Sequence, residues 1–327
     1  MQFSDFAKGS LGMIALLFGG EPALPQTFDR LEIHSFQSAT PTNKQFLTGE
    51  ANVKPALLSA ELRIPKPGSA KLPAIVLIHD SGGISSSHDR WAQALNAIGV
   101  AVLVVDSFTG RGIVRTIDDQ SLLDPGAMMI DAYRALALLA QHQRIDSSRI
   151  AVIGFSKGAM AAVYSSNQRF RTLYGPANLE FAAHIGLYTP CYVTYSDDPR
   201  VTGKPIRLFH GVADDFLSIV PCRAYVERLK RVGANVSLTE YAGAHHLYDD
   251  ARFVSPLRLP FAPTPRNYLV HEGDNGQLLN SKTGQPFDPA GDPCIERGAT
   301  LAYNGTAHEA SMTSVKEFLT TNFGLNR

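Results

Sequence analysis

Residues 149–160 read RIAVIGFSKGAM, and this stretch decides the fold. Its apolar run at 150–153 is typical of a strand buried on both faces, and helix formers follow at 159–163. Between them lies the pattern G-x-S-x-G, in which Gly154 and Gly158 allow a sharp turn from strand to helix. Ser156 is therefore predicted at the tip of that turn, with its hydroxyl exposed as a candidate nucleophile.

Length and charge limit the classes of protein this chain can belong to. With 327 residues, 44% of them hydrophobic and 18% charged, it is long enough to bury a large core in one α/β domain. Thirty basic and thirty acidic residues leave no net charge, which argues against a nucleic-acid surface. No apolar run approaches the roughly 20 residues of a membrane-spanning helix. A small neutral or singly charged substrate fits this composition best.

The first 27 residues are ambiguous. Lys8 and the apolar residues 11–18 resemble the core of a signal peptide, but Asp5 and the lack of a clear small-x-small cleavage site argue against one. A periplasmic or secreted location and a cytoplasmic one therefore stay equally open. The main domain is predicted over residues 28–327.

Strands and helices are predicted to alternate along this domain. Segments 28–37 and 57–64 have the alternating pattern of two antiparallel edge strands. Later strands are mostly apolar and separated by helical segments, which indicates parallel crossovers and a doubly wound, mostly parallel sheet. The later strands are predicted at 72–79, 100–105, 150–153, 181–188, 205–210 and 236–241, and the main helices at 88–98, 124–140 and 217–232.

Three strand-end turns carry the groups that acyl transfer needs. Asp214 follows the strand at 205–210, and His246 follows the strand at 236–241, so the order along the chain is Ser156, Asp214, His246. A serine hydroxyl becomes a good nucleophile when a histidine removes its proton and a carboxylate orients that histidine. Because parallel strands end at one edge of a sheet, the three groups can converge. Asp215 and His245 are adjacent alternatives that could exchange roles with them.

Four motifs, GFSKGAM, IHDSGG, LFHGVADD and YAGAHH, resemble those of the dienelactone hydrolase family in the α/β-hydrolase superfamily. They span roughly residues 57–250. The resemblance implies an α/β-hydrolase fold with Ser156 as nucleophile, Asp214 as acid and His246 as base. The backbone N–H groups of Ser81 and Lys157 then take the oxyanion-hole role.

The chain departs from the best-known family members at two positions. Those members have a cysteine nucleophile and a glutamate in the strand-end turn, where this chain has Ser156 and Asp80. It therefore resembles the serine-nucleophile branch, and dienelactone itself is not implied as the substrate. Arg111 is a candidate for binding a substrate carboxylate in a two-pronged geometry, and Asp80 and His245 are further candidates for substrate contacts.

An insertion of about residues 250–305 precedes the closing helix, which is predicted at 306–322. A proline-rich irregular segment is expected first and a hairpin over 268–280 second. Because the insertion begins beside His246, we predict a lid or pocket wall, with structural decoration as the alternative. The apolar residues expected to cover the pocket mouth or to pack beside it are Phe253, Leu257, Leu259 and Phe261.

The three cysteines fit no metal site. Cys191 and Cys222 are expected at the same sheet edge, where an oxidising compartment would allow a disulfide, and Cys294 is left free. The adjacent histidines lack further ligands at a recognisable spacing, so no metal is predicted.

Taken together, these patterns predict a serine hydrolase that cleaves carboxylic esters or lactones of small soluble acids through an acyl-enzyme, without a cofactor. An amide or peptide hydrolase with the same three residues is one alternative. A non-catalytic relative that only binds a ligand is another. The expected partner is a small molecule, and the sequence does not indicate the oligomeric state.

Overall fold

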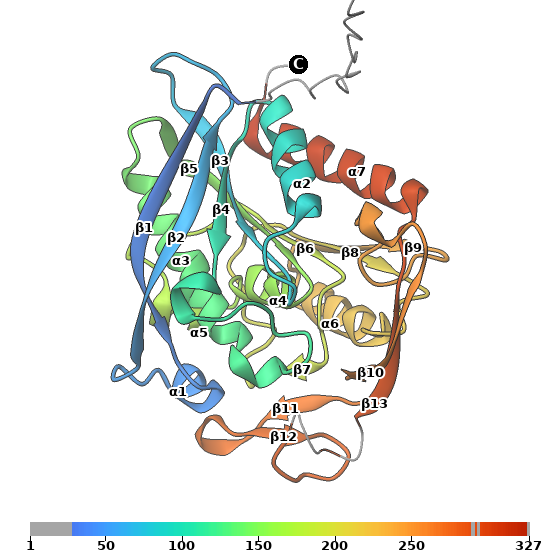
Figure 1. The fold of residues 1–327 in the computed structure, drawn as a ribbon. Coiled ribbons are helices and arrows are strands. Elements are labelled where there is room, and N and C mark those ends of the chain that lie inside the picture. The colour runs from blue at the N-terminus through green and yellow to red at the C-terminus, as the bar shows by residue number, and fades with distance from the viewer. Residues whose placement is uncertain (1–27, 289–291, 293–294, 326–327) are drawn as a thin grey trace, which may run out of the picture.

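The computed structural model describes residues 28–288, 292 and 295–325. The possible signal peptide at 1–27 and Cys294 therefore lie outside the described residues. The fold is built on an eight-stranded sheet with the order β1-β2-β4-β3-β5-β6-β8-β9 (Figure 1). The pairs β1–β2 and β2–β4 are antiparallel, and all the other neighbours are parallel, as predicted. The strands are β1 (Arg30–Thr40), β2 (Lys54–Ile64), β3 (Leu72–Ile78), β4 (Ala101–Asp106), β5 (Ile145–Phe155), β6 (His184–Leu187), β8 (Ile206–Gly211) and β9 (Val236–Tyr241).

Helices cover both faces of this sheet, as expected for a doubly wound α/β-hydrolase fold. In Figure 1, α2 and α7 lie together on one face, and α3, α4 and α6 lie on the other. No helix in the described part of the chain is long and apolar enough to cross a membrane. The helices are α1 (Asn43–Thr48), α2 (Ser86–Ala97), α3 (Pro125–Gln141), α4 (Lys157–Tyr164), α5 (Gln168–Tyr174), α6 (Val220–Arg231) and α7 (Gly305–Phe323).

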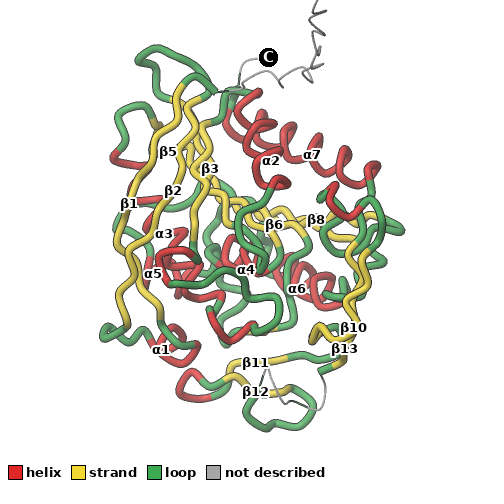
Figure 2. The backbone as a smooth tube through the Cα atoms, viewed as in Figure 1, coloured by secondary structure: helices red, strands yellow, loops and turns green. Residues whose placement is uncertain are grey.

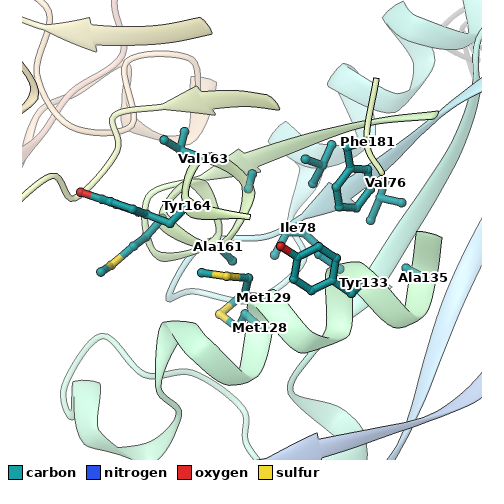
Figure 3. Packing of buried hydrophobic residues seen from close by; sticks show 14 of the residues in the cluster. Val76, Ile78, Met128, Met129, Tyr133, Ala135, Ala161, Val163, Tyr164 and Phe181 are labelled. Atoms are coloured by element: carbon teal, nitrogen blue, oxygen red, sulfur yellow. The ribbon is translucent and has the colours of Figure 1, made fainter. Parts of the chain in front are cut away.

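The core lies in two layers because successive residues of a strand point to opposite faces. In β3, Val76 and Ile78 pack toward α3 and α4, whereas Ile75 and Leu77 pack in the layer with α2 and α7. This double burial explains why the central strands are apolar at every position. Figure 3 shows the first layer, where Met128, Met129 and Tyr133 of α3 meet Ala161 of α4. The methionine pair is thus part of the core, as its helical spacing indicates.

The insertion forms two small sheets outside the main one. β10 (Leu257–Thr264) pairs with β13 (Glu296–Leu301), so the proline-rich segment is a strand with a register shift rather than irregular chain. The predicted hairpin is present as β11 (Val270–Glu272) and β12 (Leu278–Asn280). β11 also pairs with β7 (Val193–Thr194), and Figure 2 shows β11 and β12 apart from the main sheet.

Cys191 and Cys222 form a disulfide, with their Cα atoms 4.9 Å apart. The bridge joins the segment between β6 and β7 to the first turn of α6. The predicted pairing is therefore present in the structure. It fixes a stretch of chain that reaches the pocket described below.

Candidate active site

Ser156 lies at the turn between β5 and α4, and its backbone has a φ of 51°. With a ψ of −118° it lies outside the left-handed helical region, and a non-glycine residue adopts such a conformation only where its surroundings enforce it. Close packing explains the two glycines of the motif. A Cβ on Gly154 would lie 2.0 Å from the Gly158 carbonyl oxygen, and one on Gly158 would lie 2.3 Å from the His79 carbonyl oxygen. The turn therefore needs both glycines, and it places Ser156 at the strand end.

Ser156, His246 and Asp214 form one hydrogen-bonded chain. The Ser156 Oγ lies 3.1 Å from His246 Nε2, and His246 Nδ1 lies 2.8 Å from Asp214 Oδ2. The three residues follow β5, β9 and β8, which end at the same edge of the parallel sheet. All three are buried, so the predicted exposure of the Ser156 hydroxyl is wrong, and Ser156 opens only into the pocket that it lines. The structure thus brings together the three residues that the sequence singled out.

Donors surround the Asp214 carboxylate. Its Oδ1 accepts the backbone N–H groups of Phe216 and Leu217 at 2.9 and 2.8 Å, and its Oδ2 lies 3.5 Å from His210 Nε2. Burial acts to raise the pKa of Asp214, but the His246 and His210 rings outweigh it and hold that pKa well below its usual range. An ionised Asp214 keeps a proton on His246 Nδ1 and leaves Nε2 able to accept one.

Two aromatic side chains hold the His246 ring in place. The ring centroids of Tyr188 and Phe216 lie 4.8 and 4.9 Å from that of His246, both edge-on. The Tyr188 hydroxyl donates to the buried Asp249 carboxylate at 3.0 Å, and the Trp91 indole N–H donates to the same carboxylate at 2.6 Å. The orientation of His246 therefore depends on a buried polar network behind it.

Ser81 and Lys157, the predicted oxyanion donors, line the same pocket as Ser156. Lys157 is the first residue of α4, so its backbone N–H has no acceptor within the helix. Its ammonium donates to the carbonyl oxygens of Gln120 and Leu123 at 3.0 and 2.9 Å. Burial lowers the pKa of Lys157 to about 7. Through its two hydrogen bonds, the Lys157 side chain holds residues 120–123 against the turn that carries Ser156.

The pocket beside Ser156 has a volume of about 80 Å³ and mostly apolar walls. Met160, Pro190 and Tyr192 form part of the wall, and the disulfide fixes the segment that carries the last two. The insertion supplies a further wall. Its contributing residues are Pro263, Thr264, Pro265, Tyr268 and Ile295.

The predicted mouth residues of the insertion do not line this pocket. Leu259 and Phe261 line an adjoining hollow instead, and Phe261 is 79% exposed. Phe253 packs against the core, and Leu257 is exposed. Leu259 and Phe261 therefore lie beside the pocket, which is one form of the expectation, whereas Phe253 and Leu257 line neither hollow.

Asp215 and His245 point away from the hydrogen-bonded chain. Asp215 accepts from the Arg258 guanidinium and from the Thr300 backbone N–H, both at 2.7 Å, and so ties the acid turn to the insertion. His245 is half-buried, and its Nδ1 has no partner among the described residues. Neither Asp215 nor His245 lines the pocket, so this geometry gives no support to His245 as a substrate contact.

Asp80 lies beneath the turn that carries Ser81 and does not line the pocket. Its Oδ1 accepts the Gly82 backbone N–H at 2.5 Å, and its Oδ2 lies 3.6 Å from His88 Nε2. Burial raises the pKa of Asp80 to about 6. These contacts indicate that Asp80 stabilises the turn that carries Ser81 and does not contact the substrate.

The prediction that Arg111 binds a substrate carboxylate is wrong, because its guanidinium is already occupied. It donates to both carboxylate oxygens of Asp131 at 2.8 Å. Its remaining donors contact the Thr40 hydroxyl and the carbonyl oxygens of Ser107 and Ala39. No fork is left for a substrate carboxylate, and Arg111 does not line the pocket. Its role in the structure is to join β1 to α3.

Among the described residues, Glu32, His34 and His142 form the one group that could hold a metal ion. Glu32 Oε2 lies 2.9 Å from His34 Nε2 and 3.2 Å from His142 Nε2. However, the Arg144 backbone N–H donates to His142 Nδ1, which places the proton of the neutral ring on Nε2. A metal would need the lone pair of that Nε2. The geometry therefore favours a hydrogen-bonded cluster, and none of the three residues lines the pocket.

Sequence reasoning assigned no role to His210, Phe216 or Tyr188, which all contact the hydrogen-bonded chain. His210 and Phe216 lie close to Asp214 along the chain, so their position at a strand end was an available signal. Tyr188 has a φ of 41°, and only the folded backbone shows this. Constrained backbone of this kind often marks functional sites.

Solved structures show the same fold. The chain is similar to the dienelactone hydrolase-like promiscuous phosphotriesterase P91 from metagenomic libraries, at 16% identity over 88% of this chain and 98% of that one, with a TM-score of 0.55. The structure named m3DLH is similar at 17% identity over 89% and 98% of the two chains, with a TM-score of 0.55. A search of the curated proteins returned no match.

The model of the dienelactone hydrolase family matches residues 60–252, which is more than half of the chain. The matched span contains the turn at Ser156, the turn after β3, the turn after β8 that carries Asp214, and His246. These are the segments whose motifs suggested the family in the sequence. The chain belongs to the dienelactone hydrolase family.

Proposed function

We propose that this protein is a serine hydrolase that cleaves carboxylic esters or lactones of small substrates through an acyl-enzyme on Ser156. The observation that carries the proposal is the hydrogen-bonded chain from Ser156 through His246 to Asp214. Membership of the dienelactone hydrolase family makes hydrolysis the expected class of reaction. Chemistry by this route needs no cofactor.

Each step of the reaction has a group in place. His246 Nε2 takes the hydroxyl proton of Ser156 as Oγ attacks the carbonyl carbon, and Asp214 stabilises the resulting imidazolium. The backbone N–H groups of Ser81 and Lys157 stabilise the oxyanion. His246 then returns the proton to the leaving alcohol. The same ring activates a water that hydrolyses the acyl-enzyme and releases the acid.

The pocket favours uncharged esters with an apolar acyl or alcohol group. Lys157 is the one basic side chain among the described residues that line it, and its Nζ donates to two backbone carbonyl oxygens. Arg111 is bonded to Asp131 and is not available. We therefore propose a substrate without the second carboxylate that a free guanidinium would bind.

A covalent label and a substrate screen test the proposal. A fluorophosphonate should modify the wild type at Ser156, as located by peptide mass spectrometry, and should leave the Ser156→Ala variant unlabelled. Short p-nitrophenyl esters should be hydrolysed much faster than the matching p-nitroanilides. Faster anilide cleavage would favour the amide or peptide hydrolase. Undiminished ester turnover in Ser156→Ala would rule out the proposed mechanism.

A further inference from the structure

His210 lies between the proposed catalytic acid and the disulfide. It is fully buried on β8, with Nε2 2.9 Å from the Leu217 carbonyl oxygen and 3.5 Å from Asp214 Oδ2. On the other edge of the ring, Nδ1 lies 3.8 Å from Cys222 Sγ, and Cys222 is bonded to Cys191. One imidazole therefore connects the bridge to the acid.

The hydrogen-bond partners decide where the His210 proton lies. The Leu217 carbonyl oxygen can only accept, so the proton lies on Nε2 and Nδ1 carries a lone pair. A disulfide sulfur has no hydrogen to offer that lone pair. A Cys222 thiol would have one, and two acceptors lie within its reach: His210 Nδ1 and the Thr189 carbonyl oxygen, the latter 3.2 Å from Sγ.

We propose that His210 is a positioning residue that makes the rate of the hydrolase depend on the oxidation state of the Cys191–Cys222 bridge. The inference rests on the proposed function and adds regulation to the same site. A dithiol reductant that opens the bridge delivers two electrons and two protons to the sulfurs. Two thiols form, and the reductant closes to its own disulfide.

The effect passes through the ring in three steps. The Cys222 S–H donates to His210 Nδ1, and the polarised ring then carries more positive charge at Nε2, which donates to the Leu217 carbonyl oxygen and lies 3.5 Å from Asp214 Oδ2. Asp214, now holding its charge more tightly, accepts less strongly from His246. His246 becomes a weaker base toward Ser156, and the chemical step slows.

The bridge also has a structural role that the test must separate from this effect. Pro190 and Tyr192 flank Cys191 and line the pocket, so loss of the bridge can loosen substrate binding by itself. Two variants both lack the disulfide and differ only in whether a sulfur remains at position 222. Cys191→Ala keeps a thiol at position 222, and Cys191→Ala/Cys222→Ala removes it.

Steady-state kinetics on the best ester and the low-field proton NMR resonance of His246 Nδ1–H compare the two variants. We expect kcat of Cys191→Ala to be roughly two- to tenfold below that of the double variant, the range of one buried hydrogen bond. KM should be equal in the two, and the resonance should lie at higher field in Cys191→Ala. Both differences should disappear when His210→Gln is added to each variant.

Equal kcat and an equal resonance in the two variants would overturn the inference, because the thiol would then act on Thr189 alone or not at all. A difference that survives in the His210→Gln background would overturn it as well, by showing another route. If the wild type turns over no ester, the proposed function fails. The resonance comparison needs no turnover and still decides the role of His210.

Discussion

The carboxyl edge of the parallel sheet and the insertion after His246 meet at one pocket, but they are held in different ways. At the sheet edge, strand ladders and tight turns fix Ser156, Asp214 and His246. The insertion consists of short strands in two small sheets, attached by ion pairs such as Arg169–Glu272 and Arg258–Asp215. One region is held by the long ladders of a single sheet, and the other by short ladders together with ion pairs.

This difference suggests a division of work. Catalytic groups need positions accurate to a fraction of an ångström, which buried parallel strands provide. Selection of a substrate needs only a wall of suitable shape, which an insertion can supply and vary. Changes to the catalytic groups at the sheet edge should therefore act on kcat, and changes to the pocket wall in the insertion should act on KM. Buried charged groups that support either region should act on stability. The following experiments test that division.

The largest effect is expected at the base. His246→Ala should lower kcat/KM for a small ester roughly 10⁴-fold, because no group remains to take the Ser156 proton. His245→Ala is the matched control, and its loss should stay below about tenfold because His245 lies outside the hydrogen-bonded chain. The reverse ranking would show that the wrong histidine has been assigned.

Asp80, also at the sheet edge, should affect the pH dependence of stability. Its folded pKa of about 6 lies above the unfolded value, so its contribution is present below about pH 4 and lost as pH rises through 6. Asn does not titrate. The free energy of unfolding of Asp80→Asn, measured relative to that of the wild type, should therefore rise by about 2–3 kcal/mol as the pH is raised from 4 to 8.

Urea denaturation across this range measures the change. Asp106→Asn is the control of opposite sign. Burial acts to raise the pKa of Asp106, but hydrogen bonds from Thr109 and Phe108 lower it overall, so its titration is complete by pH 5. The difference between Asp106→Asn and the wild type should be constant from pH 5 to 8. A difference for Asp80→Asn that is also constant would contradict burial of its charge.

In the insertion, the Glu272 carboxylate should matter for stability. Its side chain is 4% exposed and accepts two Arg169 N–H groups, at 2.7 and 2.6 Å, and the Ser196 backbone N–H. Glu272→Gln removes the buried charge that pairs with Arg169, leaves Asp197 as the other acidic neighbour of that guanidinium, and should cost about 2 kcal/mol in free energy of unfolding. Glu180→Gln breaks the exposed pair with Lys204 and should have little measurable effect. Equal effects would mean that Glu272 does not anchor β11.

The smallest effect is expected at the pocket wall. Tyr268→Ala removes a buried side chain that lines the pocket and should raise KM for longer acyl chains roughly tenfold, with kcat changed less than about twofold. Phe261→Ala, at an exposed position of the adjoining hollow, should leave both constants unchanged. A fall in kcat alone for Tyr268→Ala would show that the insertion acts on the chemistry and would break the comparison.

Much of the sheet was predictable because the relevant signals are local. The apolar runs at 72–79 and 150–153 correspond to β3 and part of β5, where burial on both faces demands apolar residues at every position. Helix α1 was missed between the two edge strands. Its signal was present as a capping box, in which the Thr42 and Gln45 side chains bond each other's backbone, but the helix is only six residues long.

By itself, the sequence determined the strand-turn-helix at Ser156 and the placement of acidic and imidazole side chains at two further strand ends. These follow from periodicity and turn chemistry over a few residues. Tertiary structure alone decided that His246, rather than His245, bonds Ser156 and that Asp214, rather than Asp215, bonds His246. The direction of a side chain at a strand end depends on the backbone of its turn and on partners far away in the sequence.

The same reason explains Arg111 and the pocket wall. Arg111 is occupied by Asp131, which follows it by 20 residues on another element. The wall formed by Tyr268 and Ile295 exists only because β11 pairs with β7 and β10 pairs with β13. Local sequence determines which residues stand at the edge of the sheet. Pairings between distant segments decide which of these residues meet. The free energy of such pairings depends on the whole fold, so no single motif predicts them.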